Sequence, residues 1–263
     1  MSALVTYETI DDVAVVALDR PASLNALTAD MVDQLAEALL RAITEDVGAA
    51  VLAGNGRAFC AGHDLHEVQD PAQRSANRRD LERIQDVTRL LARSPHPVVA
   101  AVQGYALGAG LEFALGCDLV VAARGTQLGF PEVAVGLSVT GGATRILPVT
   151  VGPAVAKELI LLGERIPAER AQALGLVNVV VEADELRGTA LGYARRLAAR
   201  PRESLRTAKR SLDLGLHGGL EAVLQREIDD ALGLVAVDQG ATGGDLFRAH
   251  GPDMSRRSGE SDE

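Results

Sequence analysis

The chain has 263 residues, of which 47% are hydrophobic and 24% charged, a composition that suits one or two globular domains with a substantial core. Its formal net charge of −10 at pH 7 argues against a nonspecific binder of nucleic acid or of an anionic membrane surface, because such proteins are usually basic. No apolar stretch is long enough to span a membrane, so we expect neither a nucleic-acid partner nor a membrane partner.

Strands and helices alternate through the first half of the chain, a pattern that favours an α/β core. The predicted strands are short and apolar. Thr28 stands just before the first helical repeat, where its hydroxyl can cap the helix N-terminus. The predicted elements, in chain order, are a hairpin at 4–7 and 13–18, a helix at 28–43, a strand at 49–53, a helix at 80–92, a strand at 98–102, a helix at 109–116 and a strand at 119–122.

After about residue 150 the pattern becomes mostly helical. One short strand, Val177 to Val181, interrupts it. The last residues, 251–263, are polar, and we expect them to fray. The predicted helices cover residues 152–163, 167–174, 183–199, 201–215 and 218–236.

Cysteines and histidines predict neither a disulfide framework nor a metal site. Cys60 and Cys117 have no metal-ligand spacing, and we expect them to be reduced core thiols in a cytoplasmic protein. The first residues lack the basic and apolar regions of a signal peptide. His63 and His66 are three residues apart, but no convincing further ligands accompany them, so we expect no metal. We expect the isolated His96 to be exposed or to cap a helix.

Two glutamates, Glu112 and Glu132, are the leading candidates for chemistry. Each closes a turn, Gly104 to Glu112 in one case and Gly129 to Glu132 in the other, and an apolar run lies between them. Burial raises the pKa of a carboxyl, and a second carboxylate nearby raises one of the two further. Such a pair suits acid–base chemistry on an uncharged substrate. Taken singly, either glutamate could simply favour a helix dipole.

Two glycine-containing turns follow buried strands, at residues 56–65 and 104–112. Open α/β sheets commonly bind ligands at the carboxyl ends of their strands. Free backbone N–H groups at a helix start can bind an oxygen that becomes anionic, and small residues let it approach closely. Each turn alone is most often only a turn. The motifs of a nucleophilic serine elbow, a phosphate loop and a dinucleotide fingerprint are missing from the sequence.

Taken together, the motifs resemble the enoyl-CoA hydratase/isomerase family, also called the crotonase family, over roughly residues 4–250. The resemblance implies an α/β fold of the crotonase type, a spiral of ββα units over residues 1–195, followed by a helical C-terminal region at 196–263. It rests on Leu18-Asp-Arg-Pro, Asn25-Ala-Leu, Ala58-Phe-Cys-Ala-Gly-His-Asp-Leu65, Gly104-Tyr-Ala-Leu-Gly-Ala-Gly-Leu-Glu112, Cys117-Asp-Leu and Phe130-Pro-Glu132 with Gly136.

The resemblance also implies a reaction. Members of the family bind acyl-CoA thioesters and hold the thioester oxygen with two backbone N–H groups, which match His63 and Ala109. In the hydratases, the residue matching Glu112 activates the water that attacks Cβ, and the residue matching Glu132 delivers a proton to Cα. The implied activity is reversible syn hydration of a trans-2-enoyl-CoA to a 3-hydroxyacyl-CoA, without a metal or redox cofactor.

Two other activities stay open at this point. The isomerase branch of the family generally keeps only the position matching Glu132, so a Δ3–Δ2 enoyl-CoA isomerase is an alternative, as is an acyl-CoA-binding protein without turnover. The His63 side chain could either shape the acyl pocket or contact substrate. The CoA contacts that the resemblance implies are Arg20, Leu24, Arg57, Ala61, His63, Asp64, Leu65 and Phe247.

The resemblance further implies a homotrimer or a dimer of trimers, since the C-terminal helices of the family usually pack between subunits. An acidic protein that binds CoA must concentrate positive charge locally, and that charge would come from arginines because Lys157 and Lys209 are the only lysines. The apolar candidates for the contact between subunits are Leu212, Leu214, Leu216, Leu220, Val223 and Leu224.

Overall fold

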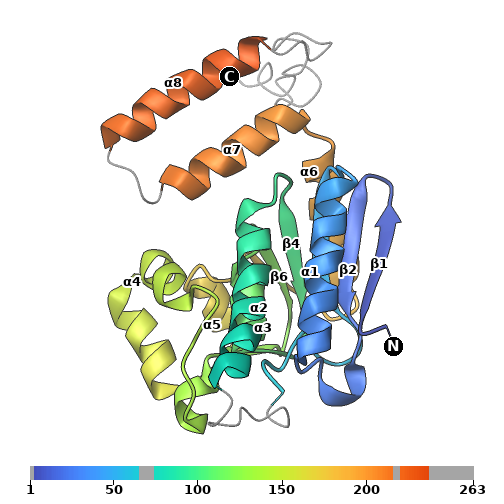
Figure 1. Cartoon of the computed structure of the whole chain (residues 1–263), viewed down its shortest axis with the longest axis vertical. Helices are drawn as coiled ribbons and strands as arrows, with labels where there is room; N and C mark the ends of the chain where they lie inside the picture. The colour runs from blue at the N-terminus through green and yellow to red at the C-terminus, as the bar shows by residue number, and fades with distance from the viewer. Residues whose placement is uncertain (1–2, 65–73, 216–219, 237–263) are drawn as a thin grey trace, which may run out of the picture. The chain divides into compact units, whose positions relative to one another are not determined.

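The computed structural model describes residues 3–64, 74–215 and 220–236 (Figure 1). The chain separates into two compact units, Met1–Asp213 and Leu214–Glu263. This division falls later than residue 195, where we expected the first unit to end, because the helix at 202–215 forms ion pairs with Asp12, Asp46 and Asp118 of the first unit. Within the second unit the structure describes one helix, α8 (Leu220–Ala236).

A six-stranded sheet forms the centre of the first unit. Its first two strands make the expected antiparallel hairpin, and all other neighbours are parallel. A parallel strand that is buried on both faces has a continuous apolar sequence, and this pattern predicted the central strands of the sheet. The order across the sheet is β1 (Val5–Ile10), β2 (Val13–Leu18), β3 (Ala49–Gly54), β4 (Val98–Val102), β6 (Leu119–Ala123) and β9 (Val179–Val181).

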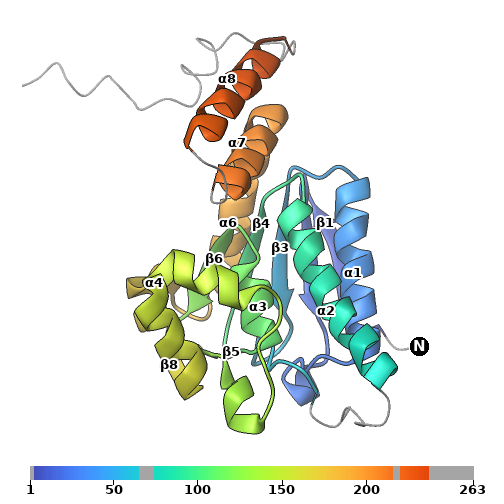
Figure 2. The ribbon, with the colours of Figure 1, turned by 60° about the vertical axis from the view of Figure 1, so that its left-hand side comes forward.

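Helices cover both faces of this sheet. Alternate side chains of a strand point to opposite faces, so Val16 of β2 packs in one core cluster and Val15 in another. Helices α1 (Ala29–Thr44) and α2 (Arg74–Arg93) lie side by side over the first face (Figure 2). Helix α6 (Leu186–Ala198) packs against the second face. The expected cap on α1 is confirmed, because the Thr28 hydroxyl accepts a hydrogen bond from the Met31 N–H at 3.3 Å.

A second, three-stranded sheet was missed by the sequence patterns. Its strands are β5 (Tyr105–Leu107), β7 (Gln127–Gly129) and β8 (Arg165–Pro167), and each has only three residues. Strands this short show no measurable alternation of apolar and polar residues. Strand β5 occupies what we expected to be a turn between Gly104 and the next helix. An isolated bridge joins Ala106 of β5 to Cys60, which brings the two glycine-containing segments together.

The remaining elements follow the prediction with shifted ends. Helix α2 begins at Arg74 rather than at residue 80, and α4 begins at Ala143 rather than at 152. A kink at Gly152, with φ of 77°, divides α4 just before Pro153. The other elements are the short helices η1 (Pro21–Ser23) and η3 (Pro131–Val135), and the helices α3 (Ala109–Leu115), α5 (Ala168–Ala173) and α7 (Arg202–Gly215).

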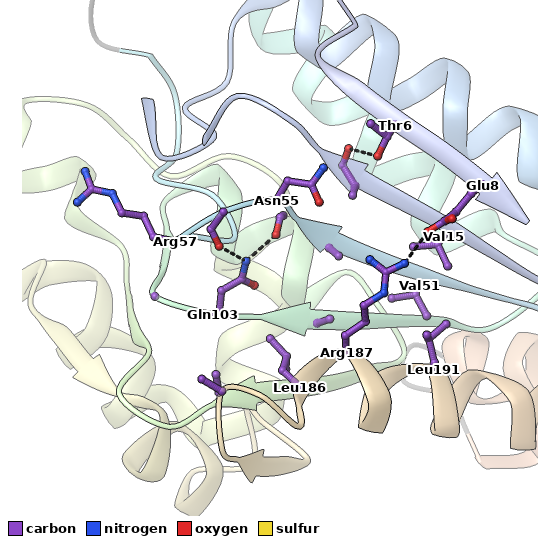
Figure 3. A pocket seen from close by; sticks show the side chains of 18 of the residues that line it. Thr6, Glu8, Val15, Val51, Asn55, Arg57, Gln103, Leu186, Arg187 and Leu191 are labelled. Atoms are coloured by element: carbon purple, nitrogen blue, oxygen red, sulfur yellow. Dashed lines mark hydrogen bonds and ion pairs between the residues drawn. The ribbon is translucent and has the colours of Figure 1, made fainter. Parts of the chain in front are cut away.

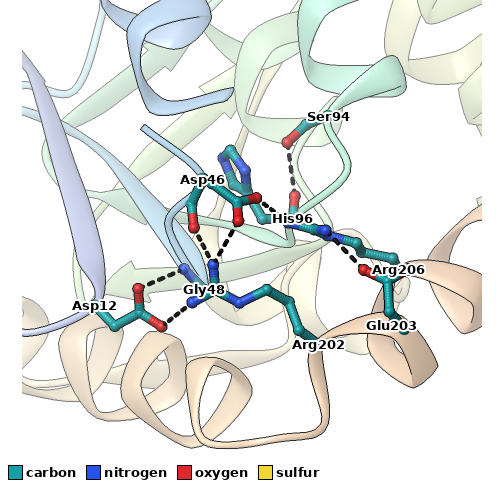
Figure 4. A network of polar contacts seen from close by, with 8 residues as sticks. All are labelled: Asp12, Asp46, Gly48, Ser94, His96, Arg202, Glu203 and Arg206. Atoms are coloured by element: carbon teal, nitrogen blue, oxygen red, sulfur yellow. Dashed lines mark hydrogen bonds and ion pairs between the residues drawn. The ribbon is translucent and has the colours of Figure 1, made fainter. Parts of the chain in front are cut away.

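His96 is buried, so the first alternative that we expected for it, an exposed histidine, was wrong. It lies under charged residues of α7, which the sequence places more than a hundred residues later (Figure 4). There the Arg202 guanidinium binds the Asp12 carboxylate at 2.7 Å, and Arg206 binds Asp46. Burial and the nearby charges of Lys209 and Arg206 lower the pKa of His96 to about 4. The imidazole is therefore neutral at physiological pH.

Some apolar side chains of the last helices face solvent. Leu212 on α7 is 73% exposed, and Leu214 and Leu224 are also exposed. The homotrimer or dimer of trimers that these residues were expected to mediate stays a prediction. Of the other candidates, Leu216 and the side chains of Leu220 and Val223 lie outside what the structure describes. None of the helices within the described ranges is both long and apolar enough to cross a membrane.

Candidate active site

Glu112 lies on the first turn of α3 and is only 1% exposed. Both of its carboxylate oxygens accept hydrogen bonds from Thr140, Oε1 from the backbone N–H at 2.6 Å and Oε2 from the hydroxyl at 2.8 Å. Burial raises the pKa of Glu112 to about 7, the bonds from Thr140 oppose this rise, and the charge of Glu132 adds to it. A carboxyl with a pKa close to neutrality suits general acid–base catalysis.

Gly141 packs directly against this carboxyl. A Cβ atom built on Gly141 would lie 2.6 Å from both Cβ and Oε2 of Glu112, closer than real Cβ contacts allow. The φ of Gly141 is also positive, at 38°. Only glycine therefore lets the Thr140 backbone approach Glu112 closely enough to donate its hydrogen bond.

Glu132 is the second buried carboxyl, at 9% exposed, and lies in η3 directly after Pro131. Its Oε2 atom is buried and has no hydrogen-bond partner among the described residues. Burial raises the pKa of Glu132, and a hydrogen bond from its own backbone N–H opposes the rise. A Cβ on Gly108 would lie 2.6 Å from Oε1 of Glu132, so this carboxyl lies against the start of α3. The structure thus brings both predicted glutamates to one end of that helix.

The backbone N–H groups of Ala109 and His63 lie near these carboxyls and have no acceptor within the described part of the chain. Ala109 is the first residue of α3, so its N–H has no intrahelical acceptor. The His63 N–H likewise makes no hydrogen bond, although the N–H groups of Ala61, Gly62 and Asp64 all do. These are the two donors that the sequence resemblance singled out.

The segments that carry the two donors touch each other. A Cβ on Gly62 would lie 2.8 Å from the Leu107 carbonyl oxygen and 3.8 Å from Cα of Gly108. His63 and Ala109 directly follow these two glycines in the chain. Two free N–H groups on touching backbones can bind one oxygen atom, the arrangement that stabilises a developing oxyanion.

The expected CoA contacts Arg20 and Asp64 bind each other. The Arg20 guanidinium lies 2.5 Å from the Asp64 carboxylate, and Nη1 also donates to the Ala26 carbonyl at 3.1 Å. Leu24 and Ala61 lie in the same pair of loops, joined by a bond from the Ala61 N–H to the Leu24 carbonyl. Arg20, Leu24, Ala61 and Asp64 therefore lie close together, next to His63. The expected contacts Leu65 and Phe247 lie outside the described residues.

Arg57 lies apart from those four. It is exposed and lines a pocket of about 730 Å³ against the sheet face that α6 covers (Figure 3). Val15 and Leu191 contribute to the apolar lining, and Arg187, which pairs with Glu8, lies at the polar side. None of the other described site candidates lines this pocket. A role of Arg57 in binding phosphate stays a prediction.

The sequence analysis missed two residues that shape the site, Thr140 and Asn25. Thr140 lies 28 residues after its partner Glu112, and no periodic pattern joins them. The only available signal was the glycine pair that follows it, since glycines often mark close backbone approach. Asn25 was noted only as part of a motif. As for metals, no group of three or more potential ligands gathers anywhere in the described ranges.

The chain is similar in sequence to known proteins. Residues 8–244 match the family model described as enoyl-CoA hydratase/isomerase. The chain is 38% identical over 221 residues to the 2,3-dehydroadipyl-CoA hydratase of Escherichia coli strain K12, a match that covers 82% of this chain and 84% of the relative. It is 33% identical over 239 residues to the crotonyl-CoA hydratase of Syntrophomonas wolfei, covering 89% and 90%.

The fold is shared as well. The solved structure of an enoyl-CoA hydratase from Bacillus anthracis superposes with a TM-score of 0.88 at 30% sequence identity, covering 94% of this chain and 96% of that one. The crotonase-type α/β fold that the sequence predicted is thereby confirmed.

Proposed function

This chain belongs to the enoyl-CoA hydratase/isomerase family, and from that premise we propose that it hydrates a trans-2-enoyl-CoA thioester to a 3-hydroxyacyl-CoA. One observation carries the proposal: Glu112 and Glu132 are both buried at the end of α3 that offers the free Ala109 N–H. Hydration needs a base for water, an acid for carbon and donors for an oxyanion, and these residue types can supply all three.

The proposed first step is attack by water on Cβ of the substrate. The Glu112 carboxylate takes a proton from the water as the new O–C bond forms. The electrons of the C=C bond move toward the thioester, whose oxygen becomes negative. The N–H groups of His63 and Ala109 donate to that oxygen, and each such donor is worth about 2.7–4 kcal/mol in systems where one has been removed.

The second proposed step is protonation of Cα. Glu132 gives its proton to that carbon, and the enolate collapses to the hydroxyacyl thioester. The raised pKa of Glu132 favours the protonated form that this step requires. A proton then passes from Glu112 back to Glu132 before the next turnover, so the net change is the addition of one water. The proposed route uses only groups of the chain, and the CoA thioester enters as substrate.

The test is the loss of crotonyl-CoA absorbance with the purified protein. Hydration of the conjugated double bond removes the chromophore, and the product can be identified by its mass. Turnover that yields 3-hydroxybutyryl-CoA supports the proposal. Binding of several enoyl-CoA chain lengths with no turnover of any would instead favour an acyl-CoA-binding protein.

A second candidate is a Δ3–Δ2 enoyl-CoA isomerase, favoured by one observation. The Oε2 atom of Glu132 is buried and unpaired among the described residues, so it could accept a proton from Cα as well as donate one. A single carboxyl that moves a proton from Cα to Cγ shifts the double bond without water. A 3-enoyl-CoA substrate distinguishes the two, because isomerisation would require Glu132 but not Glu112.

A further inference from the structure

Asn25 is a fully buried amide that binds the loop preceding His63. The two N–H donors of its Nδ2 group are shared among three carbonyl oxygens, those of Asn55 at 3.0 Å, Ala58 at 2.8 Å and Phe59 at 3.1 Å. Its Oδ1 atom accepts a hydrogen bond from the Arg20 N–H at 2.8 Å. Every polar atom of this side chain is therefore satisfied, and all of its bonds go to loop backbone.

The chain around Asn25 continues these bonds toward the oxyanion donor. The Cys60 thiol donates to the Asn25 carbonyl at 3.2 Å, and the Gly62 N–H donates to the same sulfur at 3.4 Å. Leu27 then pairs with the loop, donating to the Gly62 carbonyl at 2.8 Å and accepting from the Asp64 N–H at 2.9 Å. Residues 20–27 thus hold residues 55–64 along their length.

One N–H group near the end of this loop therefore has no acceptor within the described part of the chain. The N–H of every residue from Phe59 to Asp64 has an acceptor except that of His63. An oxyanion donor must lie about 2.7–3.1 Å from the position the oxygen will take, so a loop that carries one has to be fixed. This loop has no regular secondary structure of its own, and its position is set by the bonds described above.

We infer that Asn25 is a positioning residue that holds the His63 N–H in place to bind the thioester oxygen. The inference rests on the proposed function. Asparagine suits the position for two reasons that few residues combine: it tolerates the left-handed backbone, here with φ of 54°, and its amide supplies two donors. Aspartate shares the first property and lacks the second. Glycine shares the first and has no side chain.

The chain offers a matched control in Gln103. Its side-chain amide also donates to carbonyl oxygens of the same loop, those of Gly54 at 2.5 Å and Gly56 at 3.1 Å. It makes no side-chain bond to residues 58–64. Gln103→Met therefore removes the same kind of bond at residues 54 and 56, whereas Asn25→Gly and Asn25→Asp remove the bonds at residues 58 and 59, nearer the donor, while keeping the positive φ.

The experiment reads the thioester carbonyl directly. Butyryl-CoA labelled with ¹³C at the carbonyl is bound to each protein, and the infrared stretching frequency is compared with that of free ligand. Because butyryl-CoA has no double bond to hydrate, this reading does not depend on turnover. We expect a lowered frequency in the wild type and in Gln103→Met, and less than half of that shift in both Asn25 variants. For crotonyl-CoA we expect kcat to fall about 10²-fold in these variants, with KM changed less than about threefold.

The outcomes separate this inference from the proposed function. An undiminished carbonyl shift in folded Asn25→Gly and Asn25→Asp overturns the positioning role and leaves the hydratase intact. No shift in the wild type overturns the oxyanion hole, and the inference with it. If neither variant folds, Asn25→Ser carries the test, because a hydroxyl supplies only one of the two donors of the amide. An unchanged shift in that variant also contradicts the inference.

Discussion

Thr140 donates two hydrogen bonds to Glu112, one from its backbone N–H and one from its hydroxyl, and so binds both oxygens of the same carboxylate. These bonds lower the pKa of Glu112, against a larger rise caused by burial. The net value of about 7 is therefore a balance between the apolar surroundings and one threonine.

Thr140→Val should raise the pKa of Glu112. The variant keeps the backbone bond and loses the hydroxyl bond, so the pKa of Glu112 should rise above its present value. Since the proposed base is the carboxylate, the rising limb of kcat/KM against pH should move to higher pH, and the rate at pH 7 should fall several-fold. Thr150→Val is a suitable control, because the Thr150 hydroxyl bonds only within α4. An unmoved limb would show that the hydroxyl does not tune this carboxyl.

Glu112 should also make stability depend on pH. Its pKa rises from about 4.5 in the unfolded chain to about 7 in the folded one, so the folded state binds more protons between those values. Stability contributed by this group is therefore full below about pH 4.5 and falls as pH rises to about 7, by at most about 3 kcal/mol. Urea unfolding at pH 5 and pH 8 should show a smaller decline in Glu112→Gln than in the wild type. Equal declines in the two proteins would contradict this.

Gly108→Ala should damage activity more than stability. A Cβ at this position would lie 2.6 Å from Oε1 of Glu132 and would displace the carboxyl. Gly125→Ala is the matched control, since Gly125 also has a positive φ, 82°, but nothing lies within 4 Å of its added Cβ. Both variants should lose about 1–3 kcal/mol of unfolding free energy through backbone strain. Only Gly108→Ala should lower kcat by about 10²-fold or more, within the range that general acid–base groups contribute.

Much of the first unit could be predicted from the sequence because its signals are local. The hairpin, the Thr28 cap and the apolar runs of β3 and β4 each arise from residues close together in the chain. The proximity of the two glutamates to His63 and Ala109 could be predicted from motifs that the family resemblance ordered, while their roles stay a prediction. The structure places all four near the start of α3.

What could not be predicted depends on residues that are distant in sequence. The burial of His96 needs α7, and the bonds of Glu112 need the loop at Thr140. The strands β5, β7 and β8 form only because they pair with one another. The pairing of Arg20 with Asp64 was also invisible, since each was expected to contact CoA instead.

That pairing predicts different roles for the two candidate arginines. Asp64 is 7% exposed in its side chain, so Arg20→Gln should remove an ion pair from a buried carboxylate and lower the free energy of unfolding by about 1–3 kcal/mol. Arg57 is exposed and forms no ion pair within the described chain, so Arg57→Gln should change stability by less than about 0.5 kcal/mol. Urea unfolding of the two variants checks this, and equal losses would contradict it. The CoA affinities of Arg57→Gln and the wild type, each measured at two salt concentrations, then show whether Arg57 binds phosphate.

The central claim is that Glu112 and Glu132 perform the hydration together. The most direct measurement is the rate of crotonyl-CoA hydration by the wild type, Glu112→Gln and Glu132→Gln, each first shown to be folded and to bind butyryl-CoA. Removing a general acid or base should lower kcat by about 10²–10⁴-fold, and the account predicts a loss of this size in both variants. A wild-type rate in either variant would contradict it.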